Sequence, residues 1–497
     1  MILWLVLIPI PFAVLCLALP SSGQRRAALV AGAAAHLLLV MRSWAEPIVP
    51  MGMLQVDALS HLFITLISVL FLATSIYFVG YHQKAMVSTR VFQACMLALL
   101  ACLTLVCVSG HLGVLWVALE ASSLAATPLI YFRLGPRALE ATWKFLLMNS
   151  VGIALALMGV FCVALATTGV ESKAPLMIST LVENAVHGKL DVNWLRAGFL
   201  LALVGFGTKM GLAPLHSWKP DAYGEAPPPA AALLAGGVTL GAFIGVLRMY
   251  QVVAAAGQVA FAGFWMIVFG LLSIAVAGVF IIGNNDYRRI LAYTSVEHMG
   301  VLVLGVGISA TGQAASMLHA MHNTLNKAVL FFVAGVLWRI YRTNRISEVH
   351  GAVHRYPLVG ILLLLGLCAT TGLPPFGMFY SEFGILLAAV QQSQWCVAGL
   401  FVLTLSVVFI GVMTAMLPMA FGEPTKEAQP VSESTPGWWW RQPVMLLAAG
   451  GMAVLALSIS VYQPQGLRDA LRDAAKALDT APKMASVAVT MQQEGRP

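Results

Sequence analysis

Long apolar stretches alternate with short polar segments along the whole chain. An apolar segment of about 17–25 residues can cross a bilayer as a single helix. This pattern predicts about fourteen membrane spans. They lie near residues 2–20, 27–42, 58–80, 91–109, 112–132, 144–168, 196–216, 229–250, 259–282, 290–308, 314–338, 357–390, 396–420 and 443–462. The segment 357–390 is too long for one straight helix, so we expect a break within it.

The composition supports the same class of fold. The 497 residues are 60% hydrophobic and only 10% charged, whereas soluble domains carry about 25% charged residues. We therefore predict an all-α, polytopic helix bundle in the cell (inner) membrane. The net charge of +8 is typical of basic loops that set membrane topology, and it does not indicate binding to nucleic acid.

The loops differ in their content of lysine and arginine. Loops after odd-numbered spans hold most of these residues, and the rule that basic loops stay in the cytoplasm then places the N-terminus outside. The tail "GLRDALRDAAKALDTAPK" is amphipathic. We expect a short helix there, lying at the membrane interface.

Two of the predicted helices are interrupted within the membrane. Lys209 lies in "LALVGFGTKMGLAPLHSWKPDAYGEAPPP", and Glu382 follows the two prolines of "GLCATTGLPPFGMFYSEF". Proline removes a helical donor and clashes with the preceding turn. A break at membrane depth is tolerated only where protein or water satisfies the freed backbone groups. Broken helices in both halves of a chain indicate an ion site in a transporter built from inverted repeats.

Acidic and basic residues in the apolar segments follow a pattern that reverses between the halves. The first half has Glu120 on an early helix and Lys209 on the broken one. The second half has Lys327 on an early helix and Glu382 on the broken one. A buried lysine can release its proton when its partner moves away, whereas arginine stays protonated. The alternative is that Glu120 and Lys209 form a fixed ion pair that only fastens two helices.

Further ionisable residues lie in or beside these segments, and each also has a purely structural interpretation. Lys144 can extend to the membrane surface, and His216 and Lys219 can lie at the interface at a helix end. His319 and His322 are three residues apart on one helical face and can be hydrogen-bonded histidines of the bundle. A metal site there lacks a carboxylate or thiol at helical spacing.

Several motifs resemble one known family. "GTKMGLAPLHSWKPDAYGEAPPPAAALLAGG", "NNDYRRILAYTSVEHMG", "HNTLNKAVLFFVAG" and "GLPPFGMFYSEF" are similar to the antiporter-like proton-translocating subunits of respiratory complex I and of multisubunit cation/proton antiporters. "LWVALEASSLAATPLI" and "RALEATWKFLLMNSVG" most resemble the hydrogenase-4 component F branch. The resemblance extends from about residue 50 to residue 420.

The resemblance implies two inverted five-helix repeats, each forming a half-channel with a broken helix. The chain then divides into N-terminal helices at 1–90, half-channels at 91–250 and 251–420, and a polar loop, last helix and short tail at 421–497. It implies proton-translocation roles for Glu120, Lys144, Lys209, His216, His322, Lys327 and Glu382. Many complex I members carry another lysine after "LLAG". Leu240 lies near that position here, which leaves the link between the half-channels to other groups or water.

These observations favour a proton-translocating subunit of a redox-driven complex. The expected partners are other membrane subunits and a peripheral redox arm, either nickel–iron hydrogenase-like or NADH dehydrogenase-like. The chain shows no cluster, haem or flavin motif, so we expect no redox cofactor in it. A subunit of a cation/proton antiporter, or of an inorganic-carbon uptake system without electron transfer, stays open as the alternative.

Overall fold

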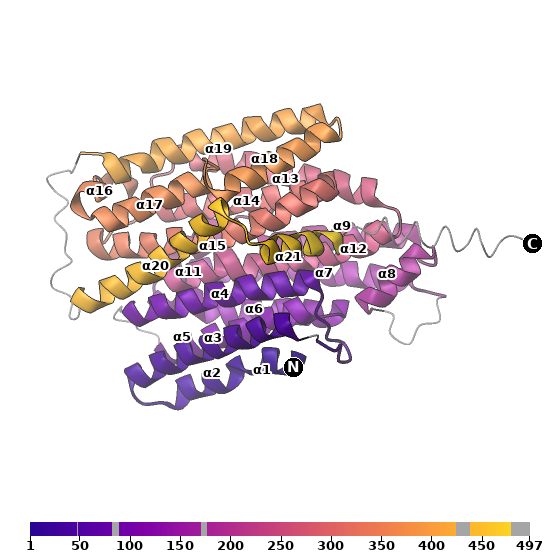
Figure 1. Cartoon of the computed structure of the whole chain (residues 1–497), viewed down its shortest axis with the longest axis horizontal. Coiled ribbons are helices and arrows are strands. Elements are labelled where there is room, and N and C mark those ends of the chain that lie inside the picture. The colour runs from indigo at the N-terminus through magenta and orange to yellow at the C-terminus, as the bar shows by residue number, and fades with distance from the viewer. Residues whose placement is uncertain (47, 82–88, 170–175, 424–437, 479–497) are drawn as a thin grey trace, which may run out of the picture.

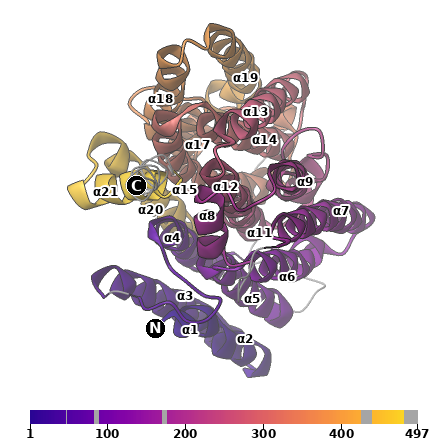
Figure 2. The same cartoon turned by 90° about the vertical axis from the view of Figure 1, so that its right-hand side faces the viewer.

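The computed structural model describes residues 1–46, 48–81, 89–169, 176–423 and 438–478. Its helices run mostly along the long axis of the molecule (Figure 1), and Figure 2 looks along many of them from one end. Most of the predicted polar loop before the last span, and the end of the tail, lie outside the described residues.

The helices of the N-terminal half are α1 (Ile2–Leu7), α2 (Pro9–Ala18), α3 (Ser22–Ala45), α4 (Ala58–Gly80), α5 (Thr89–Val108), α6 (Leu112–Ile130), α7 (Pro136–Ala166), α8 (Ile178–Val186), α9 (Val192–Met210), α10 (Trp218–Glu225), α11 (Pro228–Leu233) and α12 (Thr239–Ala255). A π-helical turn over Leu234–Val238 joins the last two.

The helices of the C-terminal half are α13 (Val259–Ile281), α14 (Tyr287–Ile308), α15 (Ala310–Tyr341), α16 (Ala352–Arg355), α17 (Pro357–Thr370), α18 (Gly377–Gln391), α19 (Trp395–Phe421), α20 (Trp438–Val461) and α21 (Gln465–Lys476).

Within the described residues, 11 helices are long and apolar enough to cross a membrane. The chain is therefore an all-helical, multi-pass membrane protein. Other predicted spans fall on shorter or interrupted helices, namely α1 with α2, α9, and α17 with α18. The expected short helix in the tail is present as α21, which packs against α4 and α15.

Both predicted helix breaks are confirmed. The first helix ends at Met210, and Gly211 follows with a φ of 85°. The second ends at Thr370, and Gly372 has a φ of 65° before α18 begins at Gly377. Glycine adopts this left-handed conformation without the steric cost that a side chain adds. The Lys219 side chain packs directly against the first glycine, and the carboxylate of Glu382 packs against the second.

Close helix contacts through glycine build the rest of the bundle. A side chain at Gly159 would collide with the carbonyl oxygen of Gly198, which lets α7 approach α9. Gly263 faces Gly307 in the same way between α13 and α14. Such small-residue interfaces are usual between membrane helices, because lipid gives no hydrophobic force to join them. The last span, α20, packs on both α4 and α15 and so connects the N-terminal helices to the second half (Figure 1).

An ion pair between the buried Arg248 and the half-buried Asp57 joins α4 to α12. The Arg248 guanidinium donates to both carboxylate oxygens of Asp57, at 2.6 and 2.8 Å. Asp57 also caps α4 by accepting from the Ser60 amide at 2.9 Å. Burial alone would raise the pKa of the Asp57 carboxyl, but Arg248 and Ser60 outweigh it and hold that pKa well below its usual range. The ion pair fixes the start of α4.

Candidate proton pathway

The first broken helix brings Lys209 against α6. Its side chain is fully buried, and its ammonium donates to the carbonyl oxygen of Leu119 and to the hydroxyl of Ser123. Glu120 lies close enough to attract it electrostatically. Within the described residues the two charges form no direct ion pair, and Glu120 Oε2 is buried without a hydrogen-bond partner. Lys209 is therefore held by neutral acceptors of α6, with Glu120 nearby but outside salt-bridge distance.

Lys219, at the start of α10, is also fully buried. Its ammonium donates to the carbonyl oxygens of Met210, at 2.9 Å, and of Ser295 on α14, at 3.1 Å. The interpretation of Lys219 as an interfacial residue is therefore wrong. Sequence reasoning missed its burial because the residue stands in a polar stretch beside Pro220 and Asp221.

The second half places Lys327 of α15 against α14. Lys327 is fully buried and donates to the Thr294 hydroxyl at 2.5 Å. Glu297, one turn further along α14, is buried and attracts Lys327 electrostatically. Its Oε2 atom has no hydrogen-bond partner among the described residues. Glu297 thus joins the site as a buried acid beside Lys327.

Two histidines continue this arrangement toward the second break. His298 Nδ1 and His319 Nε2 are 3.2 Å apart and share a hydrogen bond. The other ring nitrogens bond to the hydroxyls of Thr370 and Ser381, each at 2.9 Å. Which nitrogen carries each proton depends on the tautomer. This series of hydrogen bonds can therefore pass a proton in either direction. These contacts join α14, α15, α17 and α18.

Glu382 completes a group that sequence spacing did not reveal. Its carboxylate lies within 4.8 Å of ligand atoms of both His298 and His319. No carboxylate lies at helical spacing from His319 and His322, but α18 brings that of Glu382 to His298 and His319 from across the bundle. All four ring nitrogens of His298 and His319 already form hydrogen bonds within the protein. This arrangement suits proton transfer better than metal binding, which needs a free lone pair on each ligand nitrogen.

His322 and His216 are buried but lie apart from this hydrogen-bonded chain. The His322 ring packs against Gly377 at the start of α18, and its Nε2 has no partner among the described residues. The His216 ring lies 6.1 Å from Phe280 and 6.3 Å from Tyr293, with Nδ1 at 3.2 Å from the Pro214 carbonyl oxygen.

Lys144 lies outside the buried set. Its side chain is 47% exposed and pairs with Glu140 at 2.7 Å and Asp221 at 2.9 Å. Arg289 shares Asp221, at 2.8 Å. The surface interpretation of Lys144 thus describes its position better than a place in the buried axis. The four residues form an exposed ion-pair cluster beside α10.

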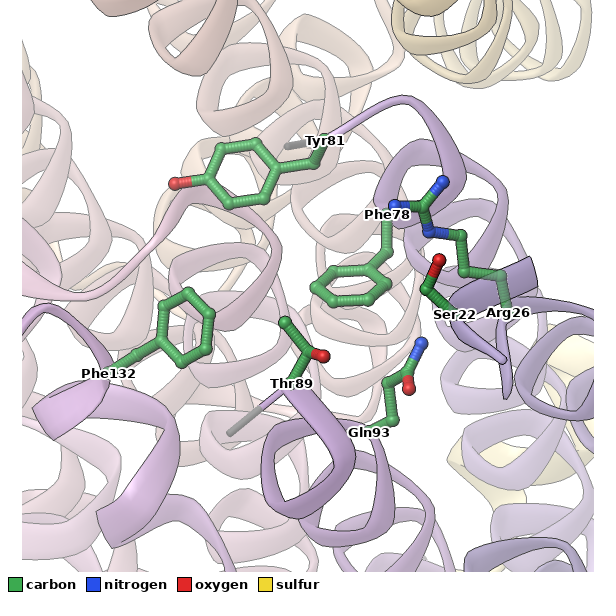
Figure 3. A pocket seen from close by; sticks show the side chains of 7 residues that line it. All are labelled: Ser22, Arg26, Phe78, Tyr81, Thr89, Gln93 and Phe132. Atoms are coloured by element: carbon green, nitrogen blue, oxygen red, sulfur yellow. The ribbon is translucent and has the colours of Figure 1, made fainter. Parts of the chain in front are cut away.

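A small cavity between the ends of α3, α4 and α5 has no link to these groups (Figure 3). Its volume of about 20 Å³ is room for about one water molecule. It is lined by Ser22, Arg26, Phe78, Tyr81, Thr89, Gln93 and Phe132. None of the candidate proton carriers lines it.

Comparison with known proteins gives the family. Residues 109–408 match the model of the transmembrane region of the NADH:quinone oxidoreductase/Mrp antiporter family. The chain belongs to this family. It is 32% identical over 399 residues to a hydrogenase-4 component F homolog of Methylacidiphilum infernorum, covering 77% of this chain and 82% of that protein.

Solved structures show the same fold. A subunit of the membrane-bound sulfane sulfur reductase, an archaeal respiratory membrane complex, superposes with a TM-score of 0.85 at 21% identity, covering 97% of this chain and 99% of the other. A subunit of the Mrp complex from Dietzia sp. superposes with a TM-score of 0.82 at 19% identity, covering 97% and 99%. The antiporter-like fold is thus shared across complexes with different chemistry.

Proposed function

We propose that this family member is the proton-translocating membrane subunit of a redox-driven complex of the hydrogenase-4 or NADH:quinone oxidoreductase type. The observation that carries the proposal is the run of buried and half-buried ionisable groups across both halves. It begins at Glu120 and Lys209, continues through Lys327 and Glu297, and reaches Glu382 through two histidines. A buried charge is costly in a membrane and usually marks an ion pathway.

We further propose about fourteen spans arranged as two inverted repeats with a half-channel in each. Each half contributes one broken helix, which carries Lys209 in the first half and Glu382 in the second, so acid and lysine exchange places between the halves. The proposed boundaries are 91–250 and 251–420. The exposed cluster of Lys144 and Asp221 then serves as an entrance for protons.

The proposed mechanism is electrostatic. A conformational change in partner subunits alters the separation of Glu120 and Lys209, and Lys209 then passes its proton toward the second half. Two unit charges at 4 Å interact by about 4 kcal/mol at an effective dielectric constant of 20. That energy changes a proton-binding equilibrium by about a thousandfold, which is enough to gate proton transfer.

The proposed subunit holds no redox cofactor of its own. Electrons then pass through a peripheral arm, hydrogenase-like or NADH dehydrogenase-like, that is carried by partner chains. His216 and His322 are proposed as side groups of the pathway, since both are buried beside the broken helices. His322 is the closer of the two to the second break, where it packs on Gly377.

A cation/proton antiporter subunit is the second candidate. The close superposition on a subunit of an Mrp complex favours it, because the fold is equally compatible with exchange that needs no electrons. An inorganic-carbon uptake subunit is a further form of this candidate. All three functions use the same buried groups, so the partner proteins must decide among them.

The test is to purify the tagged chain from its own membranes and identify its partners by mass spectrometry. A co-purifying hydrogenase-like or NADH dehydrogenase-like subunit supports the proposal, whereas antiporter subunits alone support the second candidate. The complex is then reconstituted in vesicles with a pH-sensitive dye. Glu120→Gln should leave assembly and electron transfer intact while weakening proton uptake, because it removes the charge that gates Lys209. Unchanged uptake would mean that Glu120 is only structural.

A further inference from the structure

The two halves of the candidate pathway meet at Lys219. Lys209 contacts α6 in the first half, and Lys327 contacts α14 in the second. Leu240 of α12 is buried and apolar, so it cannot carry a proton between them. Lys219 comes from α10, the short helix that follows the first break, and its amine lies between the end of α9 and the middle of α14.

The contacts of the Lys219 amine reach the immediate neighbours of both other lysines. One acceptor is the carbonyl oxygen of Met210, the residue after Lys209. The other is the carbonyl oxygen of Ser295, the residue after Thr294, whose hydroxyl binds the Lys327 amine. An ammonium has three donors, and these two bonds are all that the described residues give it. One N–H is therefore left to reach a water molecule or a neighbouring amine.

The charges around Lys219 do not hold a proton firmly on its amine. No carboxylate lies within ion-pair distance of its amine in the described part of the chain. The charged group that acts on it most is Lys327, which repels it. The ring of Tyr223, 5.7 Å from the amine, gives some compensation through its π electrons. A purely structural donor at this position would not need a charge, because a neutral donor can bond two carbonyl oxygens without the cost of burying an ion.

The local backbone holds the amine in this place. A side chain on Gly211 would overlap the Lys219 side chain, so the left-handed glycine at the end of α9 leaves the space that the lysine fills. The break in α9 therefore does two things at once: it exposes the carbonyl of Met210, and it gives the lysine a path into the bundle.

We propose that Lys219 is the proton relay between the two half-channels. Its neutral amine accepts a proton from the Lys209 ammonium through intervening water, so that an N–H bond on Lys209 breaks and one on Lys219 forms. The Lys219 ammonium then gives a proton to the neutral Lys327 amine and returns to its starting state. No electrons move in either step. This inference rests on the proposed function, since it assigns the middle step of that pathway.

The experiment compares Lys219→Met and Lys219→Arg in the complete reconstituted complex. Both variants should assemble and transfer electrons, yet each should lower proton uptake by about tenfold or more, since a positioned proton carrier commonly contributes about a hundredfold or more. The arginine variant separates a relay from a fixed donor, because a guanidinium can bond the two carbonyl oxygens but does not release its proton. Lys476→Met, which removes an exposed lysine of α21, is the matched control and should leave uptake unchanged.

Each other result would overturn the inference. Uptake at the wild-type level in Lys219→Arg would make the residue a fixed donor, and the same level in Lys219→Met would make it dispensable. Loss of assembly in both variants would make it a structural anchor of α10. All three results leave the proposed function standing, provided that the wild-type complex takes up protons. Absence of uptake by the wild type would instead refute the proposed function itself.

Discussion

Replacing Asp57 by asparagine should destabilise the bundle by a predictable amount. The substitution keeps an N-cap for α4, because asparagine caps helices as well as aspartate does. It removes the charge opposite Arg248, whose side chain is only 1% exposed. Removing one charge of a buried ion pair leaves the other unpaired and lowers the free energy of unfolding by about 3–5 kcal/mol. Asp57 itself is 34% exposed, so solvent screening favours the lower end, about 3 kcal/mol.

This free energy converts into a measurable shift of the unfolding temperature. The unfolding entropy is about 2.1 cal/mol/K per residue, which for 497 residues is about 1 kcal/mol/K if the chain unfolds as one unit. A loss of about 3 kcal/mol then lowers Tm by about 3 °C. Tryptophan fluorescence of the purified protein in detergent, at one fixed heating rate, measures the shift, because unfolding of large proteins is often irreversible.

The control for this experiment is Glu348→Gln. It breaks the exposed pair of Glu348 with Arg345, whose atoms are 3.5 Å apart. Exposed pairs contribute about 0–1 kcal/mol, so its Tm should change by about 1 °C or less. A Tm shift for Asp57→Asn no larger than that of the control would mean that the Asp57–Arg248 pair adds no more stability than an exposed pair.

The ion pair of Asp57 and Arg248 also predicts how the stability of the protein depends on pH. The folded-state pKa of Asp57 is lowered, so its stabilisation is complete above the unfolded pKa of about 3.9 and disappears as the pH falls through the folded pKa. The Tm difference between wild type and Asp57→Asn should therefore stay constant between about pH 6 and pH 8. A difference that changes across this range would mean that another group titrates with the pair.

Three further predictions concern the pathway and cofactors. Lys209→Met and Glu382→Gln should each block the same proton flux, and the double variant should be no worse than either, because groups that act as a unit have non-additive effects; additive losses would indicate two separate paths. Lys144→Met should reduce uptake less than Lys209→Met, because Lys144 is half exposed and Arg289 keeps a positive charge beside Asp221; an equal loss would place Lys144 in the obligatory path. The purified chain should contain no stoichiometric iron or flavin by elemental analysis and absorbance, and bound iron in that ratio would contradict a cofactor-free subunit.

The membrane fold and the two breaks could be predicted because their causes are local. Apolar length predicts a span, and glycine with proline predicts an interruption, as at Gly211 and Gly372. The same local pattern was misleading at Lys219 and Lys144. One stands in a polar stretch yet is fully buried, and the other stands in an apolar helix yet is half exposed. In both cases the neighbouring helices decide the burial, and they are distant in sequence.

The contacts of the second half could not be predicted for the same reason. His298, His319 and Glu382 come from three helices and meet only when α14, α15 and α18 pack together. Helical spacing within one segment gives no information about a carboxylate that arrives from another. The ion pair of Asp57 and Arg248 joins residues 191 positions apart, and neither residue shows its partner in the local sequence.

In the proposed mechanism, a proton crosses this chain by way of the buried Lys209. The most direct measurement is the ratio of protons taken up to electrons transferred, in vesicles that hold the complete complex with either wild-type chain or Lys209→Arg. The arginine keeps a positive charge beside Glu120 but does not release its proton. We predict normal electron transfer with a strongly lowered proton ratio in the variant. A wild-type ratio in Lys209→Arg would contradict this prediction and leave Lys209 as a fixed charge.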